Sequence, residues 1–177
     1  MPKHDTDEEL AWAAGFLDGD GCFSEAAGYP MLAVSGIDLE VLEHFCRAVG
    51  VGRILGPYDR RHPDRWSKKP MYAVQLYQEA TGVAQRVWPY LGMAKRAQIW
   101  KRSSWVGPVK PAEITSFSAS PSRLVFTREN LAWAAGFFDA EGCFSTTPRT
   151  GVCASITQTD RELLDRFQSI VGIGKVG

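Results

Sequence analysis

Apolar residues at the start of the chain recur first at helical spacing and then in alternation. Between residues 7 and 18 they return every three or four positions, which predicts a helix, and Gly21 is expected to end it. The stretch Thr6–Glu9 is typical of a capping box at the helix start. Alternation in Cys22–Ala26 and Met31–Ile37 then predicts a β-hairpin.

The pattern continues to about residue 102. Asp38 is expected to cap a helix that reaches about Val49. A second hairpin and two more helices are predicted at Arg53–Tyr58, Met71–Tyr77, Glu79–Tyr90 and Ala94–Arg102. The predicted unit is α-β-β-α-β-β-α with an extra helical turn, so the fold class is α+β.

A long internal repeat divides the chain into two related halves. Leu10–Ser24 returns as Leu131–Ser145 with only three differences, and after a one-residue slip Asp38–Leu42 resembles Asp160–Leu164. A repeat of this length predicts two copies of one structural unit. The second copy of the first helix is therefore expected at about Arg128–Asp139, with Gly142 ending it.

The two halves differ in length. We expect a first domain at residues 1–103, a Pro- and Ser-rich linker at 104–126, and a second domain at 127–177. The second domain contains no counterpart of Gly56–Ser103, which in the first half supplies most of a hairpin and two helices. It is therefore expected to be incomplete, because a two-stranded hairpin with little cover is marginally stable.

Charge and cysteine usage exclude several classes of protein. Acidic and basic residues are equal at 20 each, so any DNA-binding surface must be local. The sequence has no apolar run of signal-peptide or membrane-spanning length, and we expect an intracellular protein that does not enter a membrane. Four cysteines without a CxxC pair and three histidines make a structural zinc site implausible. The cysteines are expected to be reduced and mostly buried.

Each repeated helix ends in two acids, Asp18 and Asp20 in the first half and Asp139 and Glu141 in the second. The carboxyl end of a helix carries partial negative charge, so acids are unfavourable there by about 0.3–1 kcal/mol. The same unfavourable placement at two equivalent positions indicates a function. If the helices pair side by side, the acids meet, and closely spaced carboxylates need cations between them.

Glycines within the same helices support this pairing. Gly15 and Gly136 occupy equivalent positions, each next to two alanines. Glycine inside a helix costs about 0.5–1 kcal/mol relative to alanine, and a close approach by another backbone is the usual compensation. The two helices are therefore predicted to pack against each other.

The segments Ala13–Gly21 (AAGFLDGDG) and Ala134–Gly142 (AAGFFDAEG) resemble the motif that names the LAGLIDADG homing endonucleases. The resemblance implies two αββαββα repeats whose motif helices pair at a pseudo-twofold interface, with antiparallel sheets forming a saddle. In that family the sheets lie along the major groove of double-stranded DNA, and the last acid of each motif binds the catalytic Mg²⁺. Asp20 and Glu141 match those metal-binding acids.

The resemblance also implies roles for an earlier acid of each motif and for two residues outside the motifs. Asp18 and Asp139 match an earlier acid that braces the opposite domain. Gln158 resembles the polar residue that positions water or the metal shell, although the first half has Gly36 at that position. Lys95 resembles the basic residue that neutralises charge near the cut phosphate. The catalytic candidates are thus Asp20, Glu141, Lys95 and Gln158.

Two groups of residues are candidates for DNA contact. Long basic side chains in the predicted turn of the second hairpin suit phosphate contacts, and they are Arg60, Arg61, Arg65, Lys68 and Lys69. Polar positions on the strands suit base edges in the major groove, and they are Ser24, Glu25, Ser35, Gln75 and Gln78. The strand register decides which of these face DNA.

Three interpretations of function remain open at this point. The first is a site-specific, Mg²⁺-dependent endonuclease that cuts both DNA strands, of the intron or intein homing type. The second is an intron maturase of the same fold that binds RNA, and the third is a DNA-binding protein that has lost catalysis. A complete protein is expected to be a monomer on an asymmetric site, whereas a truly truncated one is expected to associate with another chain. The sequence does not reveal the DNA target.

Overall fold

The computed structural model describes residues 4–58, 69–101, 105, 127–147 and 151–177. The first half contains, in order, α1 (His4–Asp20), β1 (Cys22–Ala26), β2 (Tyr29–Gly36), α2 (Leu39–Val49), β3 (Ile54–Tyr58), β4 (Met71–Leu76), α3 (Ala80–Val87) and α4 (Met93–Trp100). The second half contains α6 (Arg128–Glu141), β5 (Gly142–Thr147), β6 (Gly151–Ile156) and α7 (Arg161–Val171). The α+β class predicted from the sequence is confirmed.

Most helix ends follow the sequence signals, and two do not. Asp38 accepts a hydrogen bond from the backbone N–H of Glu40 and caps α2, as predicted. The predicted capping box at Thr6–Glu9 is wrong, because α1 already begins at His4. Helix α3 ends earlier than predicted, since Pro89 has no N–H with which to continue the helical ladder. No described helix has the length and apolar character needed to cross a membrane.

The first half folds around one antiparallel sheet of order β1-β2-β4-β3. Phe23 pairs with Leu32, and Val34 with Val74, and these four buried side chains form the face that the helices cover. Neighbouring positions alternate to the other face, which the helices leave open. This open face is the surface that the sheet offers to a partner.

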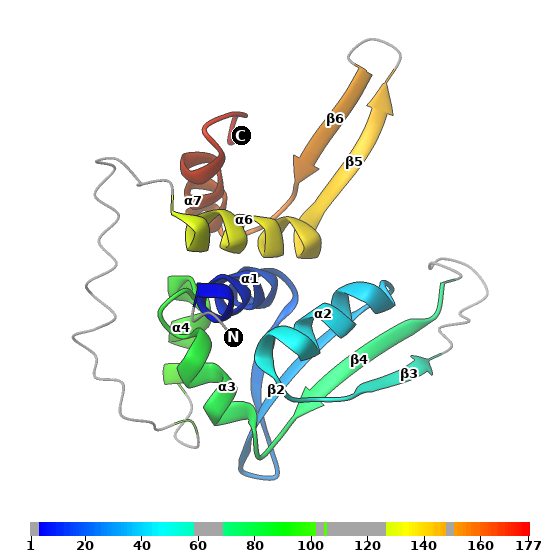
Figure 1. Ribbon diagram of the computed structural model, residues 1–177, viewed down its shortest axis with the longest axis vertical. Coiled ribbons are helices and arrows are strands. Elements are labelled where there is room, and N and C mark those ends of the chain that lie inside the picture. The colour runs from blue at the N-terminus through cyan, green and yellow to red at the C-terminus, as the bar shows by residue number, and fades with distance from the viewer. Residues whose placement is uncertain (1–3, 59–68, 102–104, 106–126, 148–150) are drawn as a thin grey trace.

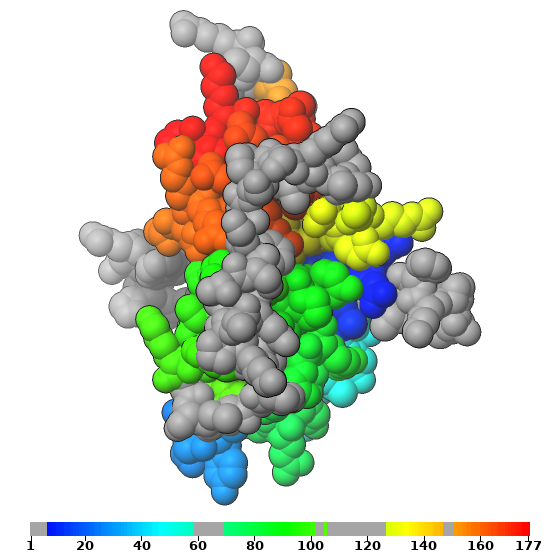
Figure 2. All heavy atoms as spheres, turned by 90° about the vertical axis from the view of Figure 1, so that its left-hand side faces the viewer, coloured from blue at the N-terminus to red at the C-terminus, as the bar shows by residue number. Residues whose placement is uncertain are grey.

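Helices α1 and α6 lie side by side between the two halves (Figure 1). A Cβ atom added to Gly15 would lie 2.9 Å from the backbone nitrogen of Phe137, and closer still to the carbonyl oxygen of Trp133. The reciprocal contact is present, because a Cβ on Gly136 would lie 3.0 Å from the backbone nitrogen of Phe16. The predicted helix pairing is confirmed, and glycine is required at both positions. Figure 2 shows the second half, yellow to red, stacked on the first half, blue to green.

The second half contains one two-stranded sheet, β5-β6, which projects away from the paired helices in Figure 1. Phe144 is 70% exposed, whereas its repeat counterpart Phe23 is fully buried. Trp105 packs edge-on against Phe23 at 5.4 Å between ring centroids, and it lies inside the segment predicted as linker. In the part of the chain that the structure describes, Phe144 contacts one aromatic ring, that of Phe138. Equivalent residues therefore have different surroundings in the two halves.

The cysteines are free, as expected, but their predicted burial is wrong. Cys22, Cys143 and Cys153 are exposed, and Cys46 is half-buried. Cys22 faces the open side of the first sheet, because it alternates with the buried Phe23. Cys143 and Cys153 lie on strands whose two faces are both open among the described residues.

Candidate functional site

The carboxyl ends of α1 and α6 meet at the junction of the two halves. A Cβ atom added to Gly19 would lie 2.9 Å from Cγ of Glu141, and closer still to the Cβ of Ala140. Gly19 and Ala140 are equivalent positions of the repeat, and one of the pair has to be glycine for the helix ends to touch. This contact brings Glu141 next to the end of the helix that carries Asp20.

Burial raises the proton affinity of both acids in this junction, and the charge of Glu141 adds to the effect at Asp20. Burial, followed by the charge of Glu141, raises the pKa of Asp20 to about 6, while Lys95 opposes the shift. Burial also raises the pKa of Glu141, against the charge of Lys95 and a hydrogen bond from Gln158. Two carboxylates that repel each other in a partly desolvated place form a site that attracts cations.

Lys95 and Gln158 reach the same junction from opposite halves. Lys95, on α4, donates a hydrogen bond to the carbonyl oxygen of Gly21. Burial lowers the pKa of Lys95, and the charges of nearby acids, Asp20 and Glu141 among them, oppose that shift. Gln158 donates from Nε2 to Oε1 of Glu141 at 2.9 Å. The structure thus brings the four catalytic candidates together.

Gln158 has a defined orientation and no equivalent in the first half. The backbone N–H of Thr159 donates to Oε1 of Gln158 at 2.7 Å, so the amide must present its NH₂ group to Glu141. Gly36 occupies the corresponding position of the repeat in the first half, as the sequence showed. The two halves of the site are therefore chemically unequal.

Asp18 and Asp139 bind tryptophans of the opposite half. The indole N–H of Trp133 donates to Asp18 at 2.8 Å, and that of Trp12 donates to Asp139 at 2.9 Å. The resemblance to the LAGLIDADG motif implied that these acids brace the opposite domain, and these two hydrogen bonds supply their partners. Asp18 is 1% exposed, whereas Asp139 is exposed, so the two bonds lie in different surroundings.

Sequence reasoning missed the residues that complete the Asp18 site. The backbone N–H of Gly92 donates to both carboxylate oxygens of Asp18, at 2.9 and 2.8 Å. Arg166 lies 3.8 Å from Asp18 and stacks over the Trp133 ring at 3.7 Å. Burial raises the pKa of Asp18 to about 6, while the Arg166 charge opposes the rise.

The repeat contained a signal that would have found Arg166. With the one-residue slip, Arg166 aligns with His44, and His44 stacks on Trp12 at 3.8 Å between ring centroids. Each motif tryptophan is thus covered by a cationic or titratable side chain from the next helix of its own half. His44 is held in turn by Glu9 at 2.7 Å.

The junction fits a hard divalent cation. No group of three or more His, Cys, Asp or Glu side chains in ligand arrangement occurs among the described residues. Mg²⁺ needs fewer protein ligands, since it usually binds through one or two carboxylates and keeps water or phosphate oxygens in its other positions. Asp20 and Glu141 could supply such a pair of carboxylates.

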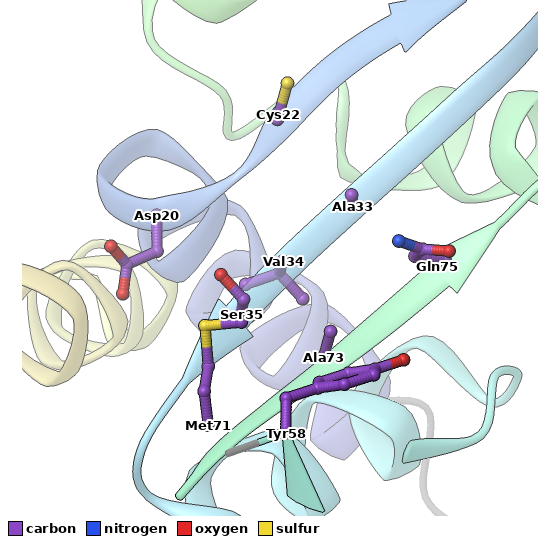
Figure 3. Close-up of a pocket in the computed structure, with 9 residues that line it drawn as sticks. All are labelled: Asp20, Cys22, Ala33, Val34, Ser35, Tyr58, Met71, Ala73 and Gln75. Atoms are coloured by element: carbon purple, nitrogen blue, oxygen red, sulfur yellow. The ribbon is translucent and has the colours of Figure 1, made fainter. Parts of the chain in front are cut away.

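The open face of the first sheet adjoins this junction. A hollow of about 360 Å³ is lined by Asp20 and by residues of all four strands, and Ser35 and Gln75 lie in it (Figure 3). Ser24 belongs to the same face, because it pairs with Met31 in the row beside Cys22 and Ala33.

Other DNA-contact candidates lie elsewhere. Glu25 pairs with Pro30 and alternates to the face of Phe23, near the end of β1 where it is exposed, and its contact with DNA stays a prediction. Gln78 lies in the turn after β4, and Lys69 is exposed just before β4. The remaining basic candidates, Arg60, Arg61, Arg65 and Lys68, fall outside the described residues.

Residues 119–173 match the family model of a LAGLIDADG-like domain. The matched segment, about a third of the chain, is thus similar to LAGLIDADG-like domains. Its first half repeats the motif of the matched segment. A search of curated proteins gave no match.

Solved structures of LAGLIDADG proteins resemble the chain at low identity. The LAGLIDADG meganuclease I-AabMI bound to uncleaved DNA shares its fold, with 19% identity and a TM-score of 0.53 over 95% of this chain and 74% of that one. The homing endonuclease I-CvuI in complex with a target is 20% identical, with a TM-score of 0.41 over 78% of this chain and 81% of that one. The likeness to I-AabMI shows the LAGLIDADG fold.

Proposed function

We propose that the protein is a DNA endonuclease of the homing type that uses Mg²⁺ to hydrolyse one phosphodiester in each strand of a double-stranded site. The observation that carries the proposal is the meeting of Asp20 and Glu141 at the ends of the paired helices, with Lys95 and Gln158 beside them. The DNA-bound state of I-AabMI supports the choice of substrate.

The residues of this chain divide the chemistry among them. Asp20 and Glu141 would hold Mg²⁺, which when bound activates water and offsets charge on a leaving oxygen. Lys95 places a positive charge beside the acids and stabilises charge that develops on a phosphate. Gln158 keeps Glu141 in one orientation and offers its amide to a water molecule. Because Gly36 replaces this amide in the first half, we expect the two strands to be cut at different rates.

Binding of the duplex uses the open face of the first sheet. Ser24, Ser35 and Gln75 face outward on adjacent strands, where side chains of a β-ribbon reach base edges in the major groove. The basic residues between β3 and β4, including Arg60 and Arg61, are proposed to contact phosphates.

The test replaces one metal-binding acid and keeps the rest of the site. Asp20→Asn removes a carboxylate without changing the size of the side chain, and Asp165→Asn is a matched control on the exposed face of α7. The DNA probe is a duplex pool selected from a randomised library by the wild-type protein in Ca²⁺. In Mg²⁺ we expect Asp20→Asn to lower the cleavage rate by on the order of 100-fold or more, with affinity for the pool within a few-fold of wild type.

The outcomes separate the interpretations. Unchanged cleavage by Asp20→Asn would refute the assignment of the site. Binding of duplex DNA by the wild-type protein without any cleavage in Mg²⁺ would instead favour a non-catalytic DNA-binding protein. Stronger binding to RNA than to duplex DNA would favour a maturase.

A further inference from the structure

The hollow beside Asp20 is lined by side chains from all four strands of the first sheet. Its strand residues are Cys22, Ala33, Val34, Ser35, Tyr58, Met71, Ala73 and Gln75 (Figure 3). The strand pairing arranges three rows across the sheet, in which Cys22, Ala33 and Gln75 form one, Ser35 and Ala73 the next, and Met71 and Tyr58 the third. The lining side chains therefore lie in successive rows that the strand pairing fixes.

Small apolar groups and a single amide dominate this surface. Ala33, Ala73 and Met71 offer methyl and thioether groups, and Gln75 supplies the only carboxamide of the hollow among the described residues. None of the described residues that line it is lysine or arginine. Apart from the Asp20 carboxylate at its end, its hydrogen-bonding capacity is thus concentrated in Gln75, with hydroxyls at Ser35 and Tyr58.

The amide of Gln75 is partly oriented by Tyr77, which lies just after the end of β4. The hydroxyl of Tyr77 donates to Oε1 of Gln75 at 3.3 Å. An amide oxygen has two lone pairs, so Oε1 can accept one further hydrogen bond while Nε2 donates. An acceptor and a donor side by side match N6 and N7 of adenine in the major groove.

We infer that this hollow reads A·T base pairs next to the cleavage centre in one half of the DNA site. Gln75 binds the adenine edge, and Ala33, Ala73 and Met71 contact the C5-methyl groups of thymines. Guanine is normally read by arginine or lysine, and the described lining contains neither. The inference rests on the proposed function, because it names the base pairs that the same DNA-binding face selects.

The first experiment selects duplexes from a randomised library with the wild-type full chain in Ca²⁺ at fixed salt. We expect enrichment of A·T pairs on one side of the site. The selected pool is then amplified with deoxyuridine in place of thymidine, which removes only the C5-methyl groups. We expect affinity to fall by about fourfold for each methyl group that was buried.

The second experiment changes the amide. Gln75→Arg places a bidentate guanine reader in the hollow, and Gln85→Arg adds the same charge at an exposed position of α3, on the helical side of the sheet. Gln75→Arg is expected to replace adenine by guanine at one position, with a change in preference of at least about fivefold. Gln85→Arg is expected to leave the base preference unchanged.

Several results would overturn the inference. These are a selected pool without A·T enrichment, equal affinity for the thymidine and deoxyuridine pools, and a base preference that Gln75→Arg and Gln85→Arg alter equally. If the wild-type protein binds and cuts duplex DNA in these cases, the proposed function survives and only the base assignment fails. If it binds no duplex at all, both fail.

Discussion

The contact between α1 and α6 makes a sharp prediction about Gly15. In Gly15→Ala, the new methyl group would lie 2.9 Å from the backbone nitrogen of Phe137 and even closer to the carbonyl oxygen of Trp133. Both neighbours are backbone atoms, so no side-chain rotation relieves the clash. The two helices have to move apart.

The cost follows from what the separation breaks. Overpacking of a close contact costs about 1–3 kcal/mol. Separation also lengthens the hydrogen bond from Trp133 to Asp18, and leaving the buried indole N–H of Trp133 unsatisfied adds about 1–3 kcal/mol. We expect Gly15→Ala to lower the free energy of unfolding by about 2–6 kcal/mol, a large part of the usual total for a domain.

Gly82 provides the matched control. It lies inside α3, and a Cβ atom there would meet no other atom within 4 Å. Gly82→Ala should therefore raise the free energy of unfolding by about 0.5–1 kcal/mol, because alanine favours the helix and restricts the unfolded chain. Urea unfolding followed by tryptophan fluorescence measures both variants.

We therefore expect the same glycine-to-alanine change to destabilise the protein at position 15 and to stabilise it at position 82. If Gly15→Ala is as stable as the wild type, or more stable, then the close backbone approach is wrong. Gly136→Ala repeats the test from the other helix, where the added atom would meet the backbone of Trp12 and Phe16.

Two further predictions concern the junction. Trp133→Phe should destabilise the protein by about 2–3 kcal/mol and Trp12→Phe by about 1 kcal/mol, because the first removes the indole donor from buried Asp18, which then keeps only the backbone N–H of Gly92 as a donor, and the second affects exposed Asp139. Equal losses in urea unfolding would contradict this difference. The pKa of Asp20 is raised to about 6, and only its charged form attracts a cation. The Mg²⁺ concentration for half-maximal cleavage should therefore rise as the pH falls through about 6, and a value independent of pH would count against Asp20 as a ligand.

The sequence predicted the elements because their signals are local. Hydrophobic spacing, the Asp38 cap and glycines at helix ends each act within a few residues. The repeat added long-range information, since two equivalent helices with embedded glycines have few ways to pack other than on each other. Asp20 and Glu141 were found for this reason.

The features that the sequence did not predict depend on which strands pair in which register and on which elements pack over them. The face of Glu25 follows from its pairing with Pro30, which hydrophobic alternation alone did not decide. The exposure of Cys143 depends on what packs over β5, and its counterpart Cys22 gives no information about that. The bonds from Gly92 to Asp18 join residues 74 positions apart through a backbone N–H, which no side-chain pattern reveals.

The distribution of the four polar groups over the two halves has a consequence during synthesis. Asp20 and Lys95 belong to the half that leaves the ribosome first, whereas Glu141 and Gln158 are made later. Under the proposed function, a nascent chain that has folded only its first half has only the Asp20 carboxylate and cannot bind a cation between two carboxylates. Nuclease activity therefore arises only when the second motif helix docks, and an abandoned or clipped first half leaves the host's DNA uncut.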